Sequence, residues 1–258
     1  MHSYRAECMG TGFIFQIEDQ AEPEKLDALC DSALEVLEDA NQRFSLYQEN
    51  SEISRLNRGE LDWSQASYQQ QQIREKAEAW RERTAGYFDA RVGGSEYDPS
   101  GIVKAWATQN AADFLLANGV RGFTINAGGD IYLSPELESP GLNRVGLSNL
   151  KSVASEGSGA NLVLDLFSSN FRAVATSGIS ERGEHIWRQD KAAEFIQVSV
   201  VGEDLVSSDI WATAIISGGK AAWKKFCENT EGQMVAIGTT RQGELISSPG
   251  FVNVLASL

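Results

Sequence analysis

Residues 122–133, GFTINAGGDIYL, contain two short β patterns, 122–126 and 130–133, on either side of a glycine-rich turn. Glycine adopts positive φ at no steric cost, so the stretch predicts a tight β-hairpin. The same glycines would also let a ligand approach the backbone closely, and both interpretations are open. The two patterns follow each other without an intervening helix, whereas doubly wound folds alternate strands and helices strictly.

The residues before this hairpin carry one β region and several helical patterns. From Tyr4 to Ile17, apolar residues alternate around Gly10-Thr11-Gly12, which predicts two strands joined at a bend or bulge. An apolar stripe with helical spacing runs from Pro23 to Phe44, with proline in the first turn. Further helices are expected at about 64–85 and from Ile102 to Asn118, each followed by a glycine.

The second half mixes short β patterns with helices near 208–217 and 220–228, and no proline-rich linker separates the halves. Its β patterns cover residues 122–126, 130–133, 161–167, 171–175, 194–201, 234–239 and 244–247. The chain has no fixed-period repeat and no strict strand–helix alternation. We therefore predict an α+β fold, a single domain over residues 1–258 with mixed or antiparallel sheets and packed helices.

Composition limits the classes of function. The 258 residues include 22 Lys and Arg against 36 Asp and Glu, a net charge of −14, which argues against nucleic acid as a partner. An anionic ligand needs a local cation or N–H donors to offset this field, which points to a metal ion. Hydrophobic residues at 42% and aromatic residues at 9% are typical of a globular protein.

Cysteine, histidine and targeting patterns add further limits. Cys8, Cys30 and Cys227 are odd in number and widely spaced, which predicts free buried thiols. Two histidines cannot build a multi-histidine zinc site, so His185 is the candidate for histidine chemistry. The sequence shows no apolar run of about 18 residues and no signal-peptide pattern, so we expect no transmembrane segment and a cytoplasmic location.

Two short patterns suggest a phosphate site and a metal site. Asp98 to Lys104 places free N–H groups at a helix start with a lysine one turn inside, which suits a phosphate. The alternative is an Asp or Ser cap followed by a surface lysine. Asp209 and Thr213 lie four residues apart on one helical face and offer hard oxygens for Mg²⁺. The alternative is a carboxylate at the helix start and a threonine bonded to the preceding turn.

A further pattern is Thr176-Ser177-Gly178, followed by Glu181, Arg182 and His185. Small hydroxyl residues ahead of a lone histidine can belong to an active site. A structural histidine that only forms hydrogen bonds is the alternative.

Taken together and in order, these motifs resemble the ApbE family of FAD:protein FMN transferases. The resemblance runs nearly from end to end and rests on short motifs in a fixed order. They are Met9-Gly10-Thr11, Phe44-Ser45-Leu46-Tyr47, 50–57, Gly86-Tyr87-Phe88-Asp89, Asp98 to Lys104, Asn126 to Asp130, Thr176 to Gly178, His185-Ile186 and Asp209 to Ala214.

The resemblance implies a Mg²⁺-dependent transfer of the FMN half of FAD to a Ser or Thr hydroxyl of an acceptor protein, with release of AMP. It implies metal ligation by Asp209, Thr213 and the main-chain carbonyl of Gly101. The positions that match the FAD site are Met9, Tyr47, Asp89, Asp98, Lys104 and Ile186. We expect catalytic roles for His185, Lys104 and Asp209, with His185 assisting deprotonation of the acceptor hydroxyl.

Departures from the family pattern keep alternatives open. Where the family continues His-Ile with Asp-Pro-x-Thr-Gly, this chain has Trp187 to Lys191, and Ala105 stands in place of the Gly after the Lys. One alternative is a Mg²⁺-dependent FAD pyrophosphatase, in which water replaces the hydroxyl and free FMN and AMP form. Another is a non-catalytic FAD-binding protein that kept the fold.

Overall fold

A computed structural model of the chain describes residues 1–19, 21–92, 96–139, 141–150, 160–167, 169–178, 194–230 and 232–256. Its centre is an eight-stranded sheet in the order β1-β2-β5-β6-β9-β10-β11-β12. The strands are β1 His2–Cys8, β2 Thr11–Ile17, β5 Phe123–Ala127, β6 Asp130–Leu133, β9 Ala173–Gly178, β10 Phe195–Gly202, β11 Val235–Thr240 and β12 Leu245–Ser247. Every strand pair within these residues is antiparallel, which confirms the α+β prediction.

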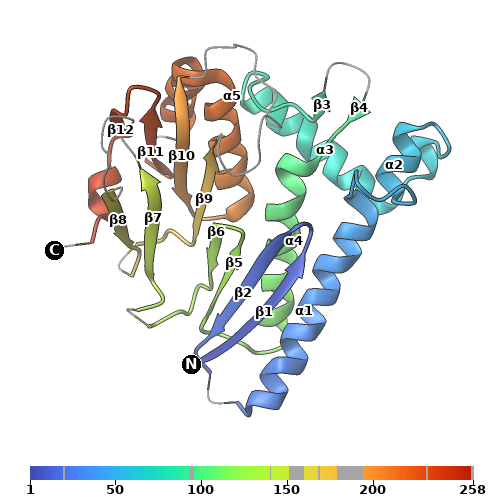
Figure 1. The fold of residues 1–258 in the computed structure, drawn as a ribbon, viewed down its shortest axis with the longest axis horizontal. Helices are drawn as coiled ribbons and strands as arrows, with labels where there is room; N and C mark the ends of the chain where they lie inside the picture. Colours follow the sequence, from blue (N-terminus) through green and yellow to red (C-terminus); the bar gives the residue numbers. More distant parts are fainter. Residues whose placement is uncertain are drawn as a thin grey trace.

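Helices cover one face of this sheet (Figure 1). They are α1 Pro23–Phe44, α2 Glu52–Asn57, α3 Tyr68–Arg83, α4 Ser100–Ala117 and α5 Leu205–Thr230. The long helices α1 and α4 pack side by side, and α5 packs on β9 and β10. The main core forms between these helices and inward side chains such as Phe13, Phe123 and Val198.

The opposite face of the sheet carries a smaller apolar layer. Strands β7 Arg144–Leu150 and β8 Ala160–Asp165 form a separate two-stranded sheet, and a 3-10 helix, η3, spans Phe251–Val254. Their apolar side chains pack against Leu133, Val174 and Val201. Because strand residues alternate between faces, the central strands are buried on both sides. Figure 1 shows this layer at the end of the molecule away from α1.

The predicted elements agree with the structure at most positions and differ at others. The first helix has the predicted bounds, and the break between the two C-terminal helices lies at Gly219, whose φ of 58° and ψ of −141° are not helical. The helix expected from about 64 begins at Tyr68, because a 3-10 turn occupies Trp63–Gln65 and Ser67 caps the helix. Helix α2 and strand β7 were not predicted. The short hairpin of β3 Arg91–Val92 and β4 Glu96–Tyr97 was not predicted either.

No helix within the described ranges is both long and apolar enough to cross a membrane.

Candidate active site

The β5–β6 hairpin supplies a buried carboxylate. Gly128 and Gly129 form its turn with φ of 62° and 100°, and the Asn126 side chain accepts a hydrogen bond from the N–H of Gly129 at 2.9 Å. These positive φ values explain the two glycines. Asp130 follows as the first residue of β6 and is 1% exposed. The hairpin interpretation is therefore confirmed, and its last residue carries a charge into the interior.

Lys104 of α4 meets this carboxylate. Its ammonium is paired with Oδ2 of Asp130 and also lies 3.4 Å from the carbonyl oxygen of Ala127. These contacts use two of the three ammonium donors. The alternative of a surface lysine is wrong, because Lys104 is buried. Burying a lone charge is costly, and Asp130 offsets this cost by placing an opposite charge beside Lys104.

Two hydrogen bonds, joined through the adjacent residues Thr176 and Ser177, connect Asp130 to α5. Oδ1 of Asp130 accepts a hydrogen bond from the N–H of Thr176 in β9 at 3.0 Å. The next residue, Ser177, has its hydroxyl 3.2 Å from the hydroxyl of Thr213 in α5. The hydroxyl of Thr176 lies 2.8 Å from the hydroxyl of Ser199 in β10. The motifs at Lys104, Asp130, Thr176 and Thr213, distant in sequence, are therefore brought together.

Helix α5 presents Asp209 and Thr213 one turn apart. Asp209 is 6% exposed, and both side chains supply hard oxygen donors of the kind Mg²⁺ prefers. Within the described part of the chain, no cluster of three His, Cys, Asp or Glu side chains exists. A cation here would therefore need main-chain, solvent or substrate oxygens besides Asp209 and Thr213. The donor set fits a hard divalent ion and does not fit zinc.

Gly101 lies in the first turn of α4, close to the segment that follows α3. A Cβ atom at Gly101 would stand 3.1 Å from the ring of Phe88. A Cβ atom at Gly218 of α5 would stand 2.2 Å from the ring of Tyr87. Because Tyr87 and Phe88 are adjacent, this segment contacts both the start of α4 and α5.

Asp98 shapes the start of α4. Its Oδ1 accepts a hydrogen bond from the N–H of Ser100 at 2.9 Å, and its own N–H donates to the carbonyl of Ala90 at 2.7 Å. The N-cap residue of α4 is Pro99 and it makes no side-chain cap hydrogen bond, so the predicted Asp or Ser cap is wrong, and Asp98 instead forms a local turn with Ser100. The carboxylate occupies part of the helix start that the sequence suggested for a phosphate.

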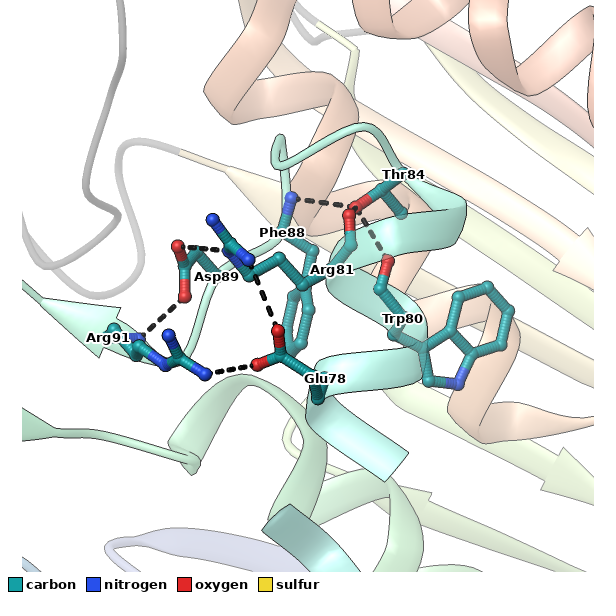
Figure 2. Close-up of polar contacts among 7 residues, drawn as sticks. All are labelled: Glu78, Trp80, Arg81, Thr84, Phe88, Asp89 and Arg91. Atoms are coloured by element: carbon teal, nitrogen blue, oxygen red, sulfur yellow. Dashed lines mark hydrogen bonds and ion pairs between the residues drawn. The ribbon is translucent and has the colours of Figure 1, made fainter. Parts of the chain in front are cut away.

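Asp89 is held by a group of ion pairs (Figure 2). Its Oδ2 accepts a hydrogen bond from Nε of Arg81 at 2.9 Å, and its Oδ1 accepts one from the N–H of Arg91 at 2.9 Å. Glu78 contacts both arginines, at 3.2 Å to Arg81 and 2.5 Å to Arg91. The hydrogen bond to Asp89 raises the pKa of the Arg81 guanidinium. Both oxygens of Asp89 therefore have protein partners.

Met9 lies at a hairpin tip next to the β5–β6 turn. It has a φ of 52° in the turn between β1 and β2 and packs in part against the core. The following residues touch the second hairpin, since Gly12 accepts a hydrogen bond from the N–H of Gly128 at 3.0 Å. Met9 therefore belongs to the same region as Asp130.

Tyr47 follows the end of α1 and is 92% exposed, so its ring is open to a ligand. His185 and Ile186, predicted as general base and FAD contact, lie outside the described residues.

The ApbE family model matches residues 9–97 and 94–237 of the chain. The chain belongs to the ApbE family. No curated protein sequence matches it. Solved structures of ApbE proteins share its fold at low identity. The flavin transferase ApbE from Vibrio cholerae has a TM-score of 0.78 at 18% identity and covers 98% of both chains.

Other ApbE structures are similar to the same extent. The ApbE protein from Thermotoga maritima has a TM-score of 0.77 at 18% identity, over 99% of each chain. The apo flavinyl transferase ApbE from Pseudomonas stutzeri has a TM-score of 0.79 at 17% identity, over 100% of this chain and 97% of its own. At such identities the likeness establishes the ApbE fold and does not assign residue roles.

Two residues of this ApbE site had no assigned role in the sequence analysis. Asp130 and Ser177 were quoted only as parts of motifs, although one is the partner of Lys104 and the other of Thr213. The sequence feature that could have identified Asp130 is its position directly after a glycine turn at the start of a strand. An aspartate is an unusual residue to bury there.

Proposed function

We propose that this ApbE-family protein transfers the FMN half of FAD to a Ser or Thr hydroxyl of an acceptor protein, with Mg²⁺ and with release of AMP. The hydrogen-bonded line from Lys104 through Asp130, Thr176 and Ser177 to Thr213 is the observation that carries it. It unites a cation, its buried carboxylate partner and hydroxyl groups on neighbouring elements, and it ends at Thr213, one turn of α5 from Asp209.

In the proposed reaction the acceptor oxygen bonds to the phosphorus on the flavin side of the pyrophosphate. The bond from that phosphorus to the bridging oxygen breaks, and AMP leaves. Such a displacement needs positioning and charge neutralisation more than a protein nucleophile. Mg²⁺, when bound, would neutralise charge on the pyrophosphate oxygens.

Asp209, Thr213 and the main-chain carbonyl of Gly101 are the proposed ligands of this ion. The burial of Asp209 and the proximity of Thr213 to Ser177 support the first two. The packing of α4, whose first turn contains Gly101, against α5 supports the third.

For FAD, we propose contacts from Met9, Tyr47, Asp89, Asp98, Lys104 and Ile186. The exposed ring of Tyr47 suits stacking on a planar heterocycle, and the third ammonium donor of Lys104 suits a phosphate oxygen. His185 takes the proton from the acceptor hydroxyl in this proposal. The acceptor and the cytoplasmic location remain predictions from the sequence.

The deciding experiment measures AMP release from FAD with Mg²⁺ and with EDTA, for the wild type and Asp209→Ala. We expect metal-dependent AMP that the variant does not produce. A candidate acceptor peptide is then analysed by mass spectrometry, where a gain of one FMN supports transfer. Free FMN with an unmodified acceptor would favour the pyrophosphatase alternative. FAD binding without AMP, in the presence of acceptor, would favour the non-catalytic one.

A further inference from the structure

The segment after α3, residues 84–91, contacts several positions of the proposed site. The buried ring of Phe88 lies against Gly101, and the carbonyl of Ala90 accepts the N–H of Asp98 at 2.7 Å. Tyr87 lies against Gly218 of α5. A shift of this segment would therefore move the start of α4 relative to α5.

A closed ring of charged groups holds this segment to α3 (Figure 2). Arg81 binds Asp89, and the backbone N–H of Arg91 binds the other oxygen of the same carboxylate. Glu78 closes the ring by pairing with the guanidinium groups of both arginines. Arg81 thus contacts two carboxylates, one on its own helix and one on the segment.

Thr84 fixes the beginning of the same segment. Its hydroxyl donates to the carbonyl of Trp80 at 2.8 Å and accepts the N–H of Phe88 at 3.1 Å. The end of α3 therefore fixes residues 88 and 89 at adjacent points. Thr84 acts through the backbone at Phe88, and Arg81 acts through the side chain of Asp89.

We propose that Arg81 is a positioning residue for the FAD and metal site, acting through Asp89 and the 88–90 segment on Asp98 and Gly101; this rests on the proposed function. The Arg81 side chain is 41% exposed and that of Asp89 is 20% exposed, so solvent screens the pair in part. An ion pair of this kind adds little to global stability. Its role is to fix where the segment lies.

The test compares Arg81→Met, Arg81→Lys and a control, Arg144→Met. Methionine keeps most of the apolar stem of arginine and removes its charge. Arg144 makes a partly exposed ion pair with Asp165 at 3.3 Å between β7 and β8. Arg144→Met therefore removes the same charge from a pair that contains none of the proposed site residues. Each protein is titrated with FAD by flavin fluorescence in the presence of Mg²⁺. The Mg²⁺ dependence of FAD binding and of AMP release is also measured.

We expect Arg81→Met to raise the Kd for FAD and the half-saturating Mg²⁺ concentration about fivefold or more, as coupled positions do. At saturating FAD and Mg²⁺, kcat should return to within about twofold of wild type, because a loss of binding energy shared by ground state and transition state raises KM and leaves kcat unchanged. Arg81→Lys should lie between wild type and Arg81→Met, because it keeps the charge but loses the planar fork. The Tm of both variants should match that of Arg144→Met.

Each outcome decides the proposal. Unchanged FAD and Mg²⁺ binding in Arg81→Met, or changes equal to those in Arg144→Met, would overturn it. Weaker FAD and Mg²⁺ binding in Arg81→Met that accompanies a lower Tm, and that Arg81→Lys does not partly restore, would also overturn it. Arg81 would then have a structural role only. A wild type that binds FAD but releases no AMP with acceptor contradicts the transfer, while the FAD titration still decides the role of Arg81.

Discussion

At the scale of single residues, the contact between Lys104 and Asp130 links the helix that begins near the proposed metal site to the central sheet. Asp130 also accepts a hydrogen bond from the backbone N–H of Thr176. One carboxylate in β6 therefore contacts both α4 and β9. A buried ammonium with one charged partner depends strongly on that partner.

Replacing Asp130 with Asn tests this dependence. The amide keeps an acceptor for Thr176 but leaves the Lys104 ammonium without a negative partner. We expect the free energy of unfolding to fall by about 3 kcal/mol, as when one member of a buried pair is removed, and FAD turnover to be lost. Urea unfolding and AMP release are the measurements.

The double variant Lys104→Met/Asp130→Asn is the matched control. It removes the unpaired charge, so most of the lost stability should return while turnover stays absent. A single variant as stable as the wild type would contradict the pairing.

The sequence predicted which residue types gather at the site better than it predicted their partners. Lys104, Asp209 and Thr213 follow from helical spacing, because positions one turn apart share a face. The partner of Lys104 is 26 residues away on another element, and local spacing carries no information about such a contact. The hydrogen bond from the N–H of Ser100 to Asp98, by contrast, is local, but it forms a turn before α4 and not the helix cap that the spacing suggested.

At the scale of elements, periodicity predicted long helices well and short elements poorly. Helix α1 has its predicted bounds because an apolar stripe and an initial proline mark it. Helix α2 has only 6 residues, too few to show a period. Strand β7 does alternate, with Val145 and Leu147 buried, but Gly146 and Asn149 weaken its β pattern.

The contact between β1 and α1 should depend on pH through Tyr4. Its hydroxyl donates to Asp31 at 2.5 Å, and this bond, together with burial, raises the pKa of Tyr4 to about 12. The unfolded tyrosine titrates near pH 10. The contribution of this group to stability is therefore complete below about pH 10 and is lost as the pH rises towards 12.

We expect the free energy of unfolding to fall more steeply between about pH 10 and 11.5 in the wild type than in Tyr4→Phe. The buried thiols of Cys8 and Cys30, whose pKa values burial raises to about 12, are present in both proteins, so the difference between the two curves reports the titration of Tyr4 and its coupling to Cys30. Parallel pH curves would contradict the assigned hydrogen bond.

Helix α5 should tolerate no added methyl group where it meets Tyr87. A Cβ at Gly218 would stand 2.2 Å from the Tyr87 ring, so Gly218→Ala must displace the ring or the helix. We expect a loss of about 1–3 kcal/mol in unfolding free energy, together with weaker FAD binding. Gly146→Ala is the control, because a Cβ there meets nothing within 4 Å. Equal effects of the two substitutions would contradict a specific contact at Tyr87.

At the scale of the whole molecule, the net charge of −14 opposes the binding of a pyrophosphate. The fold class was predictable because the order of β and helical patterns excludes strict alternation, and the antiparallel sheet confirms it. The crossing from β6 to β9, which places β7 and β8 on the far face, was not predictable, because no local pattern encodes which distant strands pair. The single domain over residues 1–258 stays a prediction.

The charge makes a final prediction about ligand-induced stability. A ligand that binds only the folded state stabilises it by about 2.7 kcal/mol at a concentration of 100 times its Kd. Without a divalent ion, the acidic chain repels FAD, so FAD in EDTA should raise Tm little, and added NaCl should increase that shift by screening. FAD with Mg²⁺ should raise Tm by more than the sum of the separate shifts. Asp209→Ala should remove this excess, because the carboxylate proposed to hold the ion is gone. Differential scanning fluorimetry in EDTA and in Mg²⁺, each with and without FAD, measures the coupling. An equal FAD shift in EDTA and in Mg²⁺ would show that substrate binding does not use the ion.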